Sequence, residues 1–196
     1  VEGQTIMNHP EFKLDHRLML DKINLDEGTV NCYGKVYPIK DTNLPTIDPA
    51  DPYKLSPEEE EVMVALEASI TNSKKLQEHI NFLYTHGALF TTYNGNLLFH
   101  GCIPFTEDGD FMEVTIAGKT NHGAGLMRQL DQELREVYFN PRCELDKADA
   151  ANLMWYLWLG PDSPLFGKDK MTTFERLFIA DKSTHKEHTV PYYKLI

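Results

Sequence analysis

The sequence predicts an α+β fold in which short helices and β-hairpins follow one another without a repeat. Asn94-Gly95 lies between two apolar runs and favours a type I′ hairpin turn, because both central residues of that turn need positive φ. Ser56-Pro57 with Glu59 combines a capping residue, a proline suited to the first helical position and a capping-box partner. One signal predicts paired strands and the other a helix start.

The first part of the chain is predicted to be mostly helical, with one small hairpin. Apolar residues spaced along Phe12 to Ile23 predict a short amphipathic helix. Residues 29–33 and 36–37, on either side of Gly34-Lys35, predict a hairpin. The proline-rich loop at 41–52 is the best candidate for an internal seam.

Two consecutive helices are predicted next. The first begins at Ser56 and continues to about Thr71, with Leu66 and Ile70 on its apolar face. The second is expected over 73–85, with Gly87 after it as a left-handed cap. Three apolar residues of this second helix are expected to face inward: Leu76, Ile80 and Leu83.

The strand Leu97–Phe99 carries the first candidate for chemistry. It is apolar on both faces and is therefore predicted to lie inside a sheet. His100 follows at its C-terminal end, next to Gly101, which lets backbone approach closely. This position suits a metal ligand or a catalytic base, and a hydrogen-bonded, partly buried histidine is the ordinary alternative.

The remainder of the chain predicts one more strand at 111–116 and helices at 126–138 and 148–157. A last helix is expected at Thr172-x-x-Glu175, which has the form of a capping box. The Gly- and Pro-rich segment 160–168 is not a phosphate-binding Walker loop, because its glycines have the wrong spacing. It is expected to be a shaped loop.

The composition disfavours several functional classes. The 196 residues include 19 Lys and Arg and 30 Asp and Glu, which gives a net charge of −11. Such a charge repels nucleic acid and anionic membrane surfaces. We find no membrane span and no signal peptide, so we expect a cytoplasmic protein. Three widely spaced cysteines are expected to be free thiols: Cys32, Cys102 and Cys143.

Other histidines and a local basic region are further candidates. His79, His86 and His122 are best interpreted as surface or capping residues. The run 182–188 is locally basic within an acidic chain; a solvated loop is its default interpretation, although the same residues could bind phosphate. From residue types alone, the sequence indicates an α+β domain with an anion-binding site.

Several long strings resemble the class III fructose-1,6-bisphosphatases of Firmicutes in the same order, from about Pro10 to the end of the chain. These strings are Tyr93-Asn94-Gly95-Asn96-Leu97-Leu98-Phe99-His100-Gly101-Cys102-Ile103-Pro104, Trp155-Tyr156-Leu157-Trp158, Ser163-Pro164-Leu165-Phe166-Gly167-Lys168, Met171-Thr172-Thr173-Phe174-Glu175-Arg176, Thr184-His185-Lys186-Glu187 and Pro191-Tyr192-Tyr193.

The resemblance implies part of a metallophosphoesterase-like α/β sandwich with a mostly helical insertion. Residues 1–86 would be the insertion or appendage, and residues 87–196 part of the core and of the substrate-pocket wall. The family's D-x-H, G-D-x-x-D-R-G, G-N-H-D and G-H-T metal-site segments do not occur in this sequence. The resemblance implies a pair of divalent metal ions in the active site, expected to be Mn²⁺. Of the metal ligands that the family implies, only His100 has a counterpart in this sequence.

The implied reaction is hydrolysis of fructose 1,6-bisphosphate to fructose 6-phosphate and phosphate. A basic cluster at the C-terminal end is the candidate for holding the sugar phosphates: Lys168, Arg176, Lys182, His185 and Lys186. We expect this chain alone to be inactive, since one histidine cannot hold two metal ions. The alternatives are a non-catalytic oligomerisation or regulatory segment, with a homo-oligomer as partner, and a stand-alone anion-binding module.

Overall fold

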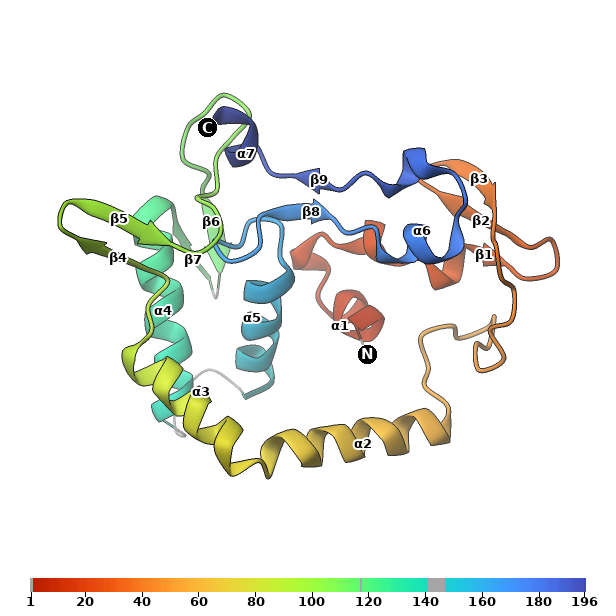
Figure 1. Cartoon of the computed structure of the whole chain (residues 1–196), viewed down its shortest axis with the longest axis horizontal. Helices are drawn as coiled ribbons and strands as arrows, with labels where there is room; N and C mark the ends of the chain where they lie inside the picture. Colours follow the sequence, from red (N-terminus) through yellow and green to blue (C-terminus); the bar gives the residue numbers. More distant parts are fainter. Residues whose placement is uncertain (1, 117, 141–146) are drawn as a thin grey trace. The chain divides into compact units, whose positions relative to one another are not determined.

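The computed structural model describes residues 2–116, 118–140 and 147–196 and divides the chain into two compact units (Figure 1). The first unit consists of Val1–Asn72 with Lys170–Glu187, and the second of Ser73–Asp169 with His188–Ile196. The segment 170–187 therefore returns to the N-terminal unit, although it is distant in sequence. Mixed helices and small antiparallel sheets confirm the predicted α+β class.

A three-stranded antiparallel sheet, in the order β1-β2-β3, forms the centre of the first unit. Its β2–β3 hairpin confirms the predicted one, with Tyr33 at φ 53° and Gly34 at φ 79° in the turn. Val30 and Cys32 of β2 form a buried cluster with Met19 and Ile179. The elements of this unit are α1 (Glu2–Asn8), β1 (Ile23–Asn24), β2 (Thr29–Cys32), β3 (Lys35–Pro38), α2 (Pro57–Thr71), α6 (Thr173–Phe178) and four 3₁₀ turns at Pro10–Phe12, Asp15–Arg17, Leu20–Lys22 and Lys182–His185.

The amphipathic helix predicted over residues 12–23 is wrong. Three separate 3₁₀ turns occupy this stretch, and Lys13 adopts a left-handed conformation at φ 54° that ends the first of them. A left-handed non-glycine residue interrupts an α-helix. The apolar spacing instead reflects burial of single side chains: Leu14 is 1% and Met19 7% exposed.

The helix α2 begins as predicted but its apolar residues are not covered within the described residues. The Ser56 hydroxyl accepts from the Glu59 amide at 3.2 Å, and the Glu59 carboxylate accepts from the Ser56 amide at 2.8 Å, which completes the capping box. Leu66 is 51% and Ile70 53% exposed, and no residue of this helix is buried. The predicted apolar face therefore has no covering here.

The second unit is built on α4, whose buried face packs against α5 and a short hairpin. Its core contains Val114, Leu126, Leu130, Leu134, Leu153 and Leu157. Helices α4 and α5 match the predicted ones at 126–138 and 148–157 closely. The elements of this unit are α3 (Lys74–His86), β4 (Phe90–Tyr93), β5 (Asn96–Phe99), β6 (Val114–Ile116), β7 (Lys119–Asn121), α4 (Gly123–Phe139), α5 (Lys147–Leu159), β9 (His188–Thr189) and α7 (Tyr192–Leu195), while β8 (Lys168–Lys170) crosses the boundary between the units.

The end of α3 corrects a predicted left-handed cap. Gly87 has φ −70° and ψ 165°, which is extended backbone, and its amide donates to the Leu83 carbonyl at 2.8 Å. The Gly87 carbonyl accepts from the Arg135 guanidinium, so a side chain of α4 completes this helix terminus. Leu83, predicted to face inward, is 57% exposed.

The start of α6 corrects a second predicted cap. The Thr172 side chain makes no capping hydrogen bond; its hydroxyl donates to the His185 carbonyl at 3.2 Å instead. Glu175 does not reach back to the helix start either, because it is 2% exposed and accepts from the Tyr33 hydroxyl at 3.0 Å. Tertiary partners have replaced both halves of the expected capping box.

The boundaries of the two compact units differ from those of the predicted segments 1–86 and 87–196. Helix α3 belongs to the second unit, and residues 170–187 belong to the first. The assignment of those segments to an appendage and a phosphoesterase core stays a prediction. Cys32 and Cys102 are buried free thiols as predicted, and Cys143 lies outside the described residues. In the described part of the chain, no helix has the length and apolar character to cross a membrane.

Candidate functional site

His100 follows the last residue of β5, as predicted. β4 and β5 pair in register from Phe90–Phe99 to Tyr93–Asn96, and the turn residues Asn94 and Gly95 have φ 49° and 75°. The positive φ values confirm the type I′ signal read from Asn94-Gly95. The hairpin therefore places an exposed histidine at the end of a strand.

The prediction that β5 lies inside a sheet is wrong for the described residues. β4 and β5 form a sheet of two strands only, and Leu97 and Leu98 are 50% and 51% exposed. Apolar side chains on both faces of a strand are normally covered on both faces. In this structure the hairpin instead presents them to solvent, on the strand that directly precedes His100.

Gly101 allows two backbone segments to approach closely beside His100. A Cβ atom at this position would lie 2.5 Å from the Pro164 carbonyl oxygen and 2.9 Å from the Leu165 carbonyl carbon. The next amide, that of Cys102, donates to the same Pro164 oxygen at 3.0 Å. The glycine is needed here for space.

The loop that receives Gly101 is held by Ser163, which is 1% exposed. Its hydroxyl donates to the Leu157 carbonyl of α5 and accepts from the Leu165 amide at 3.1 Å. The Cys102 thiol donates to the Ser163 carbonyl at 3.4 Å. The Gly- and Pro-rich segment is therefore a shaped loop, as predicted, and its role is to support the residues that follow His100.

Two side chains near His100 have raised pKa values. Burial raises the pKa of the Cys102 thiol to about 11, so this group is a neutral thiol at pH 7 and a poor metal ligand or nucleophile. Partial desolvation is the main cause that raises the pKa of Tyr193, which is 46% exposed, with a smaller contribution from Cys102. The Tyr193 hydroxyl is thus a protonated donor, and it donates to the Gly101 carbonyl at 3.2 Å.

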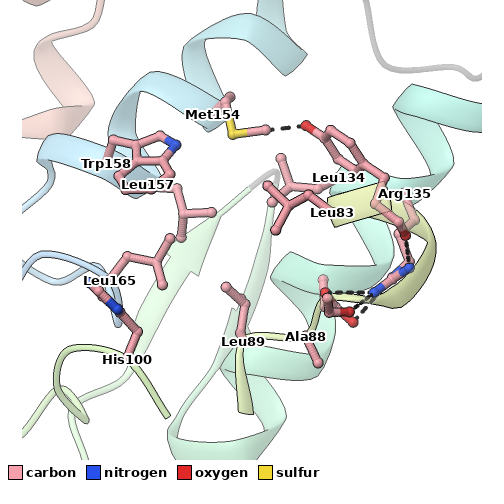
Figure 2. A pocket seen from close by; sticks show the side chains of 13 residues that line it. Leu83, Ala88, Leu89, His100, Leu134, Arg135, Met154, Leu157, Trp158 and Leu165 are labelled. Atoms are coloured by element: carbon pink, nitrogen blue, oxygen red, sulfur yellow. Dashed lines mark hydrogen bonds and ion pairs between the residues drawn. The ribbon is translucent and has the colours of Figure 1, made fainter. Parts of the chain in front are cut away.

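A cavity of about 270 Å³ has His100 on its wall. Figure 2 shows His100 at one side of the cavity and Arg135 at the other, with apolar side chains between them. The Arg135 guanidinium donates to the carbonyls of Tyr84 and Gly87 and pairs with Asp131 at 3.3 Å. Since that cation already has its partners, the cavity is suited to apolar groups and poorly suited to phosphate.

Four of the five residues in the predicted basic cluster lie in the first unit, on α6 and on the 3₁₀ turn Lys182–His185 with the residue after it. The Arg176 guanidinium donates to the Thr172 hydroxyl at 2.9 Å and to the His185 carbonyl at 3.4 Å, and lies 3.7 Å from Glu187. A His185 ring nitrogen lies 2.9 Å from the Ile179 carbonyl. Arg176 and His185 therefore have local structural partners.

The other members of the cluster differ in their setting. Lys182 and Lys186 are exposed, beside a turn capped by Asp181, whose pKa is lowered mainly by the Ser183 amide. Lys168 belongs to β8 in the second unit. The structure thus brings Arg176, Lys182, His185 and Lys186 together and assigns Lys168 to another unit.

The sequence did not reveal the supports of His100. Pro164 and Tyr193 occur in strings that resemble the phosphatase family, but nothing in their local spacing indicates contact with residues about 60 and 90 positions earlier in the chain. Only Gly101, a small residue directly after a candidate ligand, was a signal that another backbone would approach.

The fit of a metal ion to these residues is partial. Within the described ranges, His, Cys, Asp and Glu side chains form no group of three or more that could hold a metal ion. His100 is exposed and can offer one ring nitrogen. Within the described ranges, then, His100 can offer at most a single ligand, and no set of neighbouring side chains completes a metal site around it.

Comparisons with known proteins agree with the strings that resemble the phosphatase family. The model of the Firmicute fructose-1,6-bisphosphatase family matches residues 1–196. Class 3 fructose-1,6-bisphosphatases from Clostridium tetani and Clostridium botulinum strain Kyoto are 54% identical over 193 residues and 52% identical over 194, covering 98% and 99% of this chain. The enzyme from Clostridium novyi is 50% identical over 194 residues.

The chain spans 29% of the length of these curated relatives. No solved structure matches it. Because the family match extends from the first residue to the last, the chain belongs to the Firmicute fructose-1,6-bisphosphatase family.

Proposed function

We propose that this chain is part of a metal-dependent phosphatase that hydrolyses fructose 1,6-bisphosphate to fructose 6-phosphate and phosphate. The observation that carries the proposal is 54% identity, over 98% of the chain, to a protein named fructose-1,6-bisphosphatase class 3. The chain's share of that relative's length is 29%, and among the described residues no group of three or more His, Cys, Asp or Glu side chains could hold a metal ion. We therefore infer that the rest of the parent protein supplies the other ligands.

His100 is the residue that we assign to the metal site. Its exposed position at the end of β5 leaves a ring nitrogen accessible, and a neutral imidazole is a common ligand for divalent metals. When bound, a pair of Mn²⁺ ions would neutralise charge on the phosphoryl oxygens and lower the pKa of the attacking water. The contribution of His100 is to hold its nitrogen in place for that centre.

The basic cluster is the proposed phosphate-binding region. A net charge of −11 repels a sugar bisphosphate, so binding needs a local concentration of cations. Lys182 on the turn Lys182–His185 and Lys186 directly after it are exposed, with Arg176 and His185 in the same unit. Lys168 belongs to the other unit and remains a separate candidate. The apolar cavity beside His100 is not assigned to the substrate, because burying phosphate among apolar groups is costly.

The proposal is tested by phosphate release from fructose 1,6-bisphosphate. We expect the full-length protein to release the 1-phosphate in the presence of Mn²⁺, and the chain of residues 1–196 to release none. The assay measures inorganic phosphate and fructose 6-phosphate together. Turnover by the isolated chain would contradict our placement of the remaining ligands, and an inactive full-length protein with Mn²⁺ would contradict the function.

Lys186→Ala in the full-length protein is expected to raise the KM for fructose 1,6-bisphosphate about three- to tenfold, through loss of one charge-assisted phosphate contact. The exposed Lys75 of α3 gives the matched control, Lys75→Ala, with an unchanged KM. Lys186 is a cleaner test than Arg176, whose guanidinium also bonds Thr172 and His185. Equal KM values in the two lysine variants would remove Lys186 from the substrate site.

A non-catalytic role is the second candidate, and one observation favours it. Apolar side chains of α2 are exposed, among them Val64 at 66% and Ile70 at 53%. Such residues often cover an interface between copies or segments. If this chain acted only in oligomerisation or regulation, replacing His100 would leave the rate of phosphate release unchanged. A stand-alone anion-binding module would instead require a cellular product with the intact mass of this chain.

A further inference from the structure

The short helix α7 contacts the residues on both sides of His100. The Tyr192 ring packs edge-on against Phe99, with ring centroids 6.1 Å apart. The Tyr193 hydroxyl donates to the Gly101 carbonyl at 3.2 Å. Figure 1 shows α7 beside the loop that follows β5. A helix about 90 residues later in the chain therefore supports the backbone around the candidate ligand.

The peptide group between Gly101 and Cys102 is hydrogen-bonded at both of its polar atoms. Its carbonyl oxygen accepts from Tyr193, and its N–H donates to the Pro164 carbonyl at 3.0 Å. A peptide unit is planar, so two anchors on opposite edges determine its orientation. Pro164 is itself buried, and Ser163 ties its loop to α5.

This anchoring matters because the residue after His100 is glycine. Glycine occupies a wider range of φ and ψ than any other residue. Without anchoring, variation in the Gly101 backbone would therefore change the position of the neighbouring His100. The close approach of Pro164 excludes a side chain at Gly101, so a bulkier residue cannot supply the rigidity. Hydrogen bonds to the peptide group that follows Gly101 can supply that rigidity.

We propose that Tyr193 is a positioning residue for His100: its hydroxyl holds the Gly101 carbonyl and so sets the backbone from which the imidazole meets a divalent metal ion. The inference rests on the function proposed for His100 as a metal ligand. Groups that orient a metal ligand contribute to metal affinity without touching the metal. Tyr193 does so through one peptide group.

The expected effect is modest. Tyr193 is 46% exposed, so water can replace its hydroxyl at the Gly101 carbonyl, and the Pro164 anchor remains. We therefore expect Tyr193→Phe in the full-length protein to weaken Mn²⁺ binding about three- to tenfold, the range of a single hydrogen bond. The rate at saturating Mn²⁺ should stay near the wild-type value, because the histidine itself is intact.

Mn²⁺ affinity is measured directly, by the electron paramagnetic resonance signal of the free ion during titration, with no turnover required. Tyr138→Phe is the matched control, because the Tyr138 ring packs on Tyr84 and Phe139 rather than on residues 99–102. The thermal unfolding midpoint is recorded for each variant. We expect Tyr193→Phe to lose affinity at an unchanged midpoint, and Tyr138→Phe to retain affinity.

His100→Ala in the same titration separates this inference from the proposed function. If His100→Ala weakens Mn²⁺ binding and Tyr193→Phe does not, the positioning role is wrong and the metal site stands. If neither variant changes the affinity, His100 is not a ligand, and both its metal role and the positioning role of Tyr193 fall. The phosphatase function is then decided by the phosphate-release assay alone. A Tyr193→Phe loss that matches a fall in the unfolding midpoint would make Tyr193 a general stabilising residue and overturn the inference.

Discussion

Replacing His100 by alanine in the full-length protein is expected to lower the rate of phosphate release from fructose 1,6-bisphosphate by about two orders of magnitude or more. The substitution removes one ring nitrogen from the proposed metal site. His100 is exposed at the end of β5 and belongs to neither buried cluster, so its loss should leave the fold intact. The measurement is the rate with saturating substrate over a Mn²⁺ titration.

The matched control is His79→Ala, which removes an exposed imidazole from α3 in the same unit. Its rate should equal that of the wild type. The shape of the Mn²⁺ titration also matters: loss of a ligand should raise the half-saturating Mn²⁺ concentration as well as lower the maximal rate. A His100→Ala protein with full activity would return the histidine to a structural role and favour the non-catalytic interpretation of this chain.

Local chemistry explains which elements could be predicted from the sequence. The Asn94-Gly95 turn depends on the φ angles of two adjacent residues, and the start of α2 depends on a capping box within four residues. Both signals are complete in a short window. The helices α4 and α5 were also predictable, because burial of one face of α4 requires periodic apolar residues.

The two wrong cap predictions share a tertiary cause. Thr172 and Glu175 form a capping box by spacing, but their side chains bond His185 and Tyr33, residues that no local pattern indicates. Gly87 follows a helix as a left-handed cap would, yet its carbonyl is taken by Arg135 from another helix. In both cases a partner distant in sequence bonds a polar group at the helix end, and local spacing cannot indicate such a partner.

The candidate site shows the same division. The position of His100 directly after β5 could be predicted, because a polar residue that follows an apolar strand is visible in the sequence. Its environment could not, because the supports at Pro164 and Tyr193 depend on how distant loops fold back. The exposure of Leu97 and Leu98 is likewise a property of the neighbours of β5, which strand composition does not specify.

Gly101→Val is expected to destabilise the neighbourhood of His100 by about 3 kcal/mol, the upper range for overpacking a close contact. A Cβ atom would lie 2.5 Å from the Pro164 oxygen and 2.9 Å from the Leu165 carbonyl carbon. Both are backbone atoms of a loop that Ser163 holds to α5, so neither can move away cheaply. The two segments should separate and break the bond from the Cys102 amide to Pro164.

Hydrogen exchange in the full-length protein measures this locally. Protection of the Cys102 amide should fall about a hundredfold, since each 1.4 kcal/mol is a factor of ten. Gly95→Ala is the control for backbone strain: Gly95 has φ 75° and open space around its Cα, so alanine should cost only about 1–2 kcal/mol, confined to the turn. Unchanged protection of Cys102 in Gly101→Val would mean that the Pro164 loop yields, and that the close packing beside His100 does not hold the histidine in place.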